Sequence, residues 1–194
     1  MRLIVFLLLA LALTGCDRQK AEEPQAPQPS ADAQDAKGID RSHRGEAAPA
    51  VKFKNPDGGL FDLTKFRGGP VLVNLWASWC APCIKELPTL QQLDAEHAKE
   101  GRLGIIAVSQ DMAPQGSVEA FLAERDLGRF AAFHDPDMAL SAALNVEILP
   151  TTVLYNAEGK EVWRYVGDLD WTSAEARALI GEASGGQQAA ASGR

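Results

Sequence analysis

The sequence has no cluster of lysine and arginine, and its acidic residues outnumber its basic ones by 26 to 19. A net charge of −7 gives no reason to expect nucleic acid or an anionic lipid surface as a partner. Cysteine is scarce, with three residues in 194, and the three histidines show no metal-ligand spacing. The sequence therefore predicts neither a nucleic-acid-binding protein nor a metal centre.

The N-terminus lacks an apolar run long enough to span a bilayer stably. Residues 3–13 form an apolar stretch of eleven residues after Arg2, which fits the core of a signal peptide better than a membrane helix. The segment Leu13-Thr14-Gly15-Cys16 resembles the lipobox of bacterial lipoproteins, in which the signal is cleaved before the cysteine and that cysteine is lipidated. Asp17 then fits the signal that keeps lipoproteins of enteric bacteria in the inner membrane. The alternative is an ordinary secretory signal with a cysteine nearby.

Large apolar residues are nearly absent from the next segment, so it cannot bury enough surface to fold. We therefore predict a signal peptide at 1–15, a lipidated Cys16 with a flexible tether to residue 48, one folded domain at 49–183 and a disordered tail at 184–194. A coil of this length has a mean span of roughly 30 Å.

The two remaining cysteines, in Trp79-Cys80-Ala81-Pro82-Cys83, follow an apolar strand-like run and precede a helical pattern. A disulfide that closes so short a loop adds little stability by chain entropy, which favours a working pair over a structural one. At a strand-to-helix turn, the helix N-terminus favours a negative sulfur and lowers the pKa of the thiol. Cys80 is expected at the exposed turn as the attacking nucleophile, with Cys83 one turn deeper as the resolving thiol.

Alternating apolar patterns and turn residues predict a mixed α/β sheet covered on both faces. The expected strands cover residues 51–53, 60–62, 71–76, 103–108, 130–133, 151–155 and 161–166, with hairpins at both ends. The expected helices cover residues 84–99, kinked by Pro88, then 117–125, 136–144 and 172–183.

The segments Val71 to Cys83, Lys85-Glu86-Leu87-Pro88 and Ile148-Leu149-Pro150-Thr151-Thr152 together resemble the TlpA/ResA/CcmG type of thioredoxin-like protein. These are membrane-anchored bacterial thiol–disulfide oxidoreductases. The resemblance implies a thioredoxin-like fold with an N-terminal hairpin and an extra strand–helix insertion before Pro150. It needs no cofactor beyond the redox-active disulfide.

The resemblance also carries roles to residues around the pair. Pro150 corresponds to the cis-proline that packs beside the disulfide, where the Leu149 backbone is offered to an extended partner peptide. Trp79 is expected on the docking surface, and Ala81 and Pro82 set how far the thiolate is stabilised. Trp76 is expected in the core, and Trp171 as a cap on the sheet rather than a catalytic residue.

Proton handling is expected to differ from plain thioredoxin, because Asn74 stands where those proteins carry a buried aspartate. An amide cannot transfer a proton, so Glu86 or a water takes that role, or exchange is slower. Two roles are open for Glu86. It either influences the cysteine pKa values, as the resemblance implies, or is simply a carboxylate in the first helical turn, where the helix dipole favours a negative charge.

The predicted function is a monomeric oxidoreductase on the periplasmic face of the inner membrane. It would reduce protein disulfides, in apocytochrome c or copper-assembly proteins, with electrons from a membrane thiol reductant. Two alternatives stay open at this point. One is a Sco-like copper metallochaperone using Cys80, Cys83 and His134, although those proteins use CxxxC; the other is a peroxiredoxin-like peroxidase.

Overall fold

The computed structural model describes residues 38–191 except 67, 99–100, 129 and 131. The predicted signal peptide, Cys16 and residues 17–37 of the predicted tether lie outside the described residues. Within the described part, no helix is both long and apolar enough to cross a membrane.

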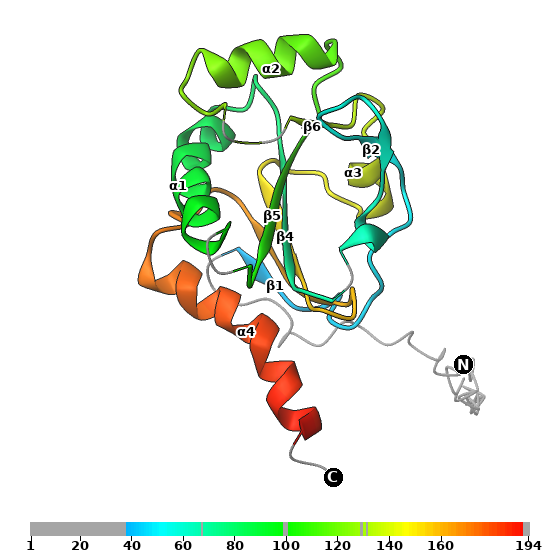
Figure 1. The fold of residues 1–194 in the computed structure, drawn as a ribbon, viewed down its shortest axis with the longest axis vertical. Coiled ribbons are helices and arrows are strands. Elements are labelled where there is room, and N and C mark those ends of the chain that lie inside the picture. Colours follow the sequence, from blue (N-terminus) through cyan, green and yellow to red (C-terminus); the bar gives the residue numbers. More distant parts are fainter. Residues whose placement is uncertain (1–37, 67, 99–100, 129, 131, 192–194) are drawn as a thin grey trace, which may run out of the picture.

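One mixed sheet of eight strands organises the domain (Figure 1). Its order is β1-β8-β7-β4-β5-β6-β2-β3, with β4 parallel to β5 and antiparallel to β7. The strands are β1 (Ile39–Asp40), β2 (Phe53–Lys54), β3 (Leu60–Phe61), β4 (Val71–Trp76), β5 (Gly104–Ser109), β6 (Phe133–His134), β7 (Thr151–Tyr155) and β8 (Glu161–Val166). The predicted strands and hairpins are all present, with shifts of a few residues at their ends, the largest at β6.

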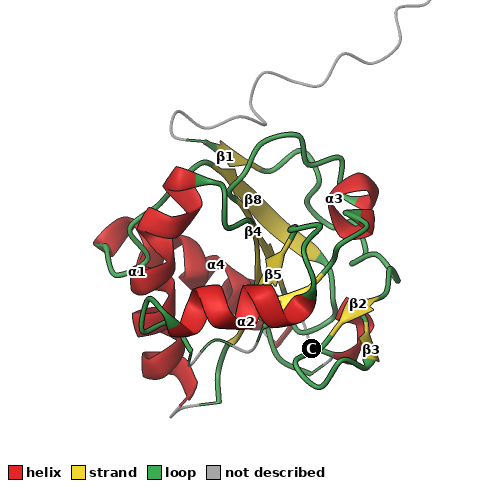
Figure 2. Cartoon of the chain, turned by 90° about the horizontal axis from the view of Figure 1, so that it is seen from above, coloured by secondary structure: helices red, strands yellow, loops and turns green. Residues whose placement is uncertain are grey.

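Helices cover both faces of the sheet, as Figures 1 and 2 show. They are α1 (Ala81–Ala98), α2 (Gln115–Ala123), α3 (Ala139–Ala143) and α4 (Ala174–Ala191). Apolar residues of α1, α2 and α4 pack in one core cluster, and Leu140 of α3 packs in the other. All six residues of β4 are buried, because Leu72 and Trp76 face the first cluster while Val71, Val73 and Leu75 face the second. The strand that leads to the cysteines is thus enclosed along its whole length.

Two predicted boundaries differ from the structure. The tether is expected to reach residue 48, but Ile39 and Asp40 form β1 on the edge of β8, so residues 38–48 belong to the domain. Glu182 of α4 also binds Arg41 and Arg44, at 2.7 and 2.8 Å. The tail is expected to be disordered from residue 184, yet α4 continues to Ala191. A two-residue strand with one buried apolar side chain gives too weak a pattern to be found in sequence.

Candidate active site

Cys80 occupies the N-cap position of α1, directly after the β4-to-α1 turn. The Cys80 carbonyl accepts the first helical hydrogen bond from Ile84 N at 3.1 Å. Its sulfur accepts from Cys83 N at 3.3 Å, so it takes the place that a serine or aspartate oxygen has in an ordinary N-cap. The expected placement of a sulfur at a helix N-terminus is therefore confirmed.

Cys80 and Cys83 form a disulfide, with their Cα atoms 5.3 Å apart. Cys83 is fully buried, as its place one helical turn further on predicts. Cys80 is only 5% exposed, which departs from the exposed nucleophile expected from sequence. The disulfide holds its sulfur against buried Cys83, so a partner can reach Cys80 only by docking closely.

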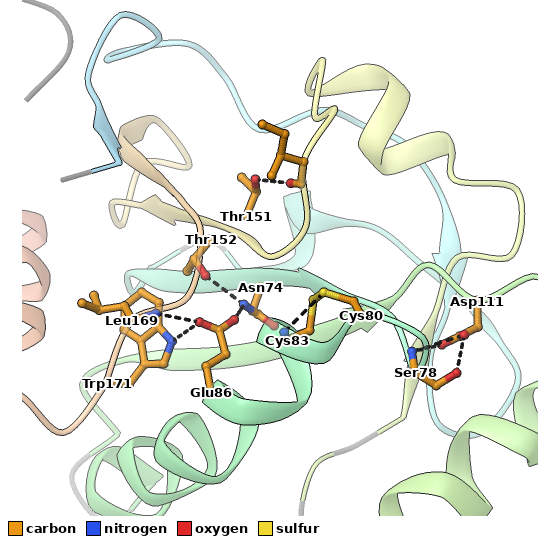
Figure 3. Close-up of a disulfide and its surroundings, with 11 residues drawn as sticks. Asn74, Ser78, Cys80, Cys83, Glu86, Asp111, Thr151, Thr152, Leu169 and Trp171 are labelled. Carbon is orange, nitrogen blue, oxygen red and sulfur yellow. Dashed lines mark hydrogen bonds between the residues drawn. A yellow bond between two sulfur atoms is a disulfide. The ribbon is translucent and has the colours of Figure 1, made fainter. Parts of the chain in front are cut away.

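A buried polar cluster lies beside the pair, between β4, α1 and the segment before α4 (Figure 3). Glu86, 2% exposed, accepts from Asn74 Nδ2 at 2.7 Å, from Leu169 N at 3.1 Å and from Trp171 Nε1 at 3.2 Å. The same Asn74 amide donates to Thr152 Oγ1, its cross-strand partner on β7, at 2.9 Å. Glu86 is thus not a solvent-facing carboxylate of the first helical turn, and that alternative is wrong.

Burial raises the pKa of Glu86 from 4.5 to about 7. The hydrogen bonds from Leu169, Asn74 and Trp171 oppose this rise because they stabilise the charged form, whereas the nearby charge of Asp168 adds to it. A carboxyl that titrates near neutral pH can both hold and release a proton under working conditions. Asn74 Oδ1 is buried without a hydrogen-bond partner, and Figure 3 shows the Asn74 side chain between Glu86 and the disulfide.

Asp111 fastens the turn that carries Cys80, and the sequence analysis did not single it out. Its carboxylate, almost fully buried, accepts from Ser78 N at 3.0 Å and from Ser78 Oγ at 2.7 Å (Figure 3). It also accepts from Ser109 Oγ at 2.7 Å. A signal was available, because β4 and β5 are parallel neighbours whose carboxyl ends meet at one edge of the sheet. The polar residues after β5 therefore had to lie beside the turn after β4.

The residues expected on the docking surface differ in how far they are exposed. The Leu149–Pro150 bond is cis, as the resemblance implies. Trp79 is 69% exposed, Ala81 and Pro82 are exposed, and Leu149 is half-buried. Pro150 itself is buried.

The other singled-out side chains have structural surroundings. Trp76 is buried in the core, as expected. Trp171 is buried too, and its bond to Glu86 ties it to the polar cluster rather than to a cap alone. His134 is buried, with Nε2 2.7 Å from the Asp111 carbonyl. No group of three or more His, Cys, Asp or Glu among the residues described could hold a metal ion, so His134 does not complete a copper site with the two cysteines.

Comparison with known proteins agrees with this geometry. The Redoxin family model matches residues 43–180. The chain belongs to the Redoxin family. It is 30% identical over 124 residues to the thiol-disulfide oxidoreductase ResA of Bacillus cereus, covering 64% of this chain and 70% of the relative. It is 33% identical over 117 residues to the thioredoxin-like protein YneN of Bacillus subtilis, covering 59% of this chain and 66% of the relative.

A solved structure has the same fold. A Chlorobium tepidum protein described as a thiol:disulfide interchange protein DsbE superposes with a TM-score of 0.64 at 27% identity, covering 72% of this chain and 96% of the other. The chain is thus a thiol–disulfide oxidoreductase with a thioredoxin-like fold. About a third of each of these two relatives lies outside the match.

Proposed function

We propose that this Redoxin-family protein is a membrane-tethered reductant of disulfides in specific exported proteins. Its clients would be apocytochrome c, whose haem-binding cysteines must be reduced, or proteins that assemble copper centres. The observation that carries the proposal is the placement of the pair: Cys80 at the N-cap of α1, with fully buried Cys83 behind it. That arrangement makes Cys80 the less buried of the two cysteines, so a closely docked partner would reach its sulfur while Cys83 stays enclosed.

The exchange proceeds in two steps. The Cys80 thiolate attacks one sulfur of the partner's disulfide, forming a mixed disulfide and releasing one partner thiolate. Cys83 then loses its proton and attacks Cys80 Sγ, which releases the second partner thiolate. Two electrons have passed to the partner, and the Cys80–Cys83 disulfide is the oxidised product.

Helix α1 favours the first step, because the Cys83 N–H and the helix N-terminus stabilise negative charge on Cys80. Pro82 has no N–H to add to this stabilisation, and no basic residue stands between the cysteines. A moderately stabilised thiolate makes the disulfide less oxidising, which favours a reductant.

Glu86 is the group we assign to the Cys83 proton. It lies one helical turn after Cys83, and its pKa of about 7 lets it accept that proton and return it. Asn74, standing between them, holds the Glu86 carboxyl in place but cannot carry the proton itself, so the proton would pass from Cys83 to Glu86 through a water beside the amide.

The remaining parts of the proposal rest on sequence. Lipidated Cys16 would anchor the protein, as a monomer, at the periplasmic face of the inner membrane. A membrane thiol reductant that draws on cytoplasmic thioredoxin would return the pair to its dithiol form. Trp79, Ala81, Pro82, Leu149 and Pro150 would form the surface on which the partner docks.

Replacing each cysteine tests the proposal. Cys80→Ser should abolish disulfide reduction by the purified protein, because the attacking thiolate is gone. Cys83→Ser should instead accumulate a mixed disulfide through Cys80, since the resolving thiol is missing. Non-reducing electrophoresis and mass spectrometry of trapped complexes from the native host would identify the client. Reduction activity retained in Cys80→Ser would overturn the assignment of the nucleophile.

The direction of electron flow is tested by the reduction potential of the pair. A reductant should lie nearer the roughly −270 mV of thioredoxins than the roughly −120 mV of strong periplasmic oxidants. Equilibration with glutathione buffers measures this value. A reduction potential close to that of the strong oxidants would contradict the proposed reducing role and would indicate that the protein oxidises its partners.

A further inference from the structure

A cavity of about 210 Å³ opens beside the cis-proline loop, outside the redox pair. It lies between the α3-to-β7 connection and the sheet edge formed by β8 and β1. Ile148 and Thr151, which bracket Leu149 and Pro150, both line it, and Thr151 Oγ1 donates to the Ile148 carbonyl at 2.7 Å. The cavity is therefore continuous with the loop that we assign to partner docking.

One part of the cavity wall is apolar and reachable. Ile148 is 60% exposed, and Val146 and Val166 are half-buried. An exposed isoleucine beside an active site leaves apolar surface that a partner's side chain can cover. These three side chains would suit the methylene stem of a long side chain.

The remaining wall is acidic. Asp40 and Glu147 both line the cavity; Asp40 accepts from Ser42 N at 2.8 Å, and Glu147 is exposed. Arg164 also lines the cavity and its charge acts on Asp40, but Glu161 binds its guanidinium at two points, each 2.8 Å. The carboxylates of Asp40, Glu147 and Glu161 therefore outnumber this one cation. His43, also in the wall, lies 3.1 Å from Glu46. The fixed charge facing the cavity is thus negative.

We propose that this cavity is a subsite for a lysine or arginine side chain of the protein whose disulfide exchanges with Cys80. The stem would lie against Val146, Ile148 and Val166, and the cationic head would face Asp40 and Glu147. In an extended peptide paired with Leu149, side chains on one face recur about every 7 Å. The basic residue would therefore stand within about two positions of the residue paired with Leu149.

This subsite deepens the proposed function by naming a property of the client. It rests on partner docking along the Leu149 backbone, but not on the direction of electron flow. A preference for basic clients can be measured whether the pair acts as reductant or oxidant, so failure of one proposal is distinguishable from failure of the other.

The test uses symmetric disulfide dimers of a short single-cysteine peptide, so that attack on either sulfur gives the same product. Lysine, glutamine or glutamate is placed one or two residues to either side of the cysteine. The full-length chain carries Cys16→Ser, so that only the Cys80–Cys83 pair reacts. Liquid chromatography measures the second-order rate constant of peptide reduction.

At one of the four positions we expect the lysine peptide to react about fivefold faster than the glutamine peptide, as two partly exposed charge pairs would give. The Asp40→Asn/Glu147→Gln double variant should lose this preference while reducing the glutamine peptide at the wild-type rate. The preference should also shrink between 20 mM and 500 mM salt, by roughly the screening expected of exposed charges. Glu158→Gln removes one exposed charge at the β7–β8 turn, away from the cavity, and is the matched control. This variant should keep the preference for the lysine peptide.

Three outcomes would overturn the subsite. The first is no lysine preference at any of the four positions. The second is a preference that persists in the double variant, which would reflect the net charge of the whole protein instead. The third is faster reaction of the glutamate peptide. Should the double variant prove unstable, each single variant is expected to lose part of the preference.

Discussion

At the scale of single residues, Glu86 has the most consequential environment in the structure. Its carboxyl is enclosed by Asn74, Leu169 and Trp171, yet burial still raises its pKa to about 7. The protein therefore keeps a group that titrates near neutral pH one helical turn from Cys83, behind the Asn74 side chain. A salt-bridged carboxylate, ionised at all working pH values, could not serve in this way.

The raised pKa of Glu86 predicts a pH dependence of stability. Folded Glu86 holds its proton between pH 4.5 and about 7, where unfolded Glu86 has released it, so the free energy of unfolding falls as pH rises through that window. The shift corresponds to about 3 kcal/mol. In Glu86→Gln this contribution should vanish, which urea titrations from pH 4 to 8 can measure.

The difference in stability between wild type and Glu86→Gln isolates this one group, because all other titrating residues are common to both. From pH 4.5 to 7 the free energy of unfolding of the wild type should fall relative to that of the variant. Above pH 7 the difference between the two should become constant. A difference that stays flat, or that changes in the opposite direction, would refute the raised pKa.

At the scale of elements, the active site is held by a connection between two strand ends. Asp111, after β5, binds both polar groups of Ser78 in the turn between β4 and α1. Cys80 N donates to the Ala77 carbonyl within the same turn, at 3.1 Å. The position of the nucleophile thus depends on a carboxylate that is distant in sequence.

Asp111→Ala should loosen this turn. Removing the acceptor leaves the Ser78 and Ser109 donors without their partner, which should lower the free energy of unfolding by about 2–4 kcal/mol. Reduction of protein disulfides should slow several-fold, because the turn no longer holds Cys80 for attack. Chemical denaturation and amide hydrogen exchange at Ser78 measure the two effects.

Asp57→Ala, in the exposed β2–β3 turn, is the matched control and should change stability by less than about 0.5 kcal/mol. Unchanged hydrogen exchange at Ser78 in Asp111→Ala would show that the carboxylate does not position the turn.

The elements themselves were largely predictable, whereas the contacts between them were not. Continuous apolar runs identify β4 and β5 because both faces of these strands are covered, and the helical stripe after Cys83 identifies α1. Local pattern says nothing about which loops meet, so Asp111 with Ser78 was missed. The positions of Cys80 and Cys83 were predictable because the CxxC spacing itself places them one helical turn apart, whereas their roles stay a prediction.

At the scale of the whole molecule, the described domain begins at the edge of the sheet. Strand β1 pairs with β8, two strands away from β4, and the Glu182 contacts to Arg41 and Arg44 hold the following segment on α4. A tether would therefore join the domain at this edge, next to Asp40 and His43 of the proposed subsite.

Membrane attachment is tested by replacing Cys16. We expect the protein to fractionate with membranes, and Cys16→Ser to move it to the soluble extract, because the acylated residue is lost. Cys16→Ser should still reduce small disulfides in solution at the wild-type rate, since the redox pair is untouched. Immunoblots of membrane and soluble fractions decide the matter, and unchanged membrane association in the variant would contradict lipidation at this residue.

The burial of the tryptophans has an optical consequence. All four lie in the described part of the chain; Trp76, Trp163 and Trp171 are at most 1% exposed, whereas Trp79, next to the disulfide, is 69% exposed. A water-soluble collisional quencher such as iodide therefore reaches one emitter, and that emitter stands where a partner would dock. Iodide quenching of Trp79 fluorescence would therefore measure binding of a partner at this surface, without a label and without an altered residue.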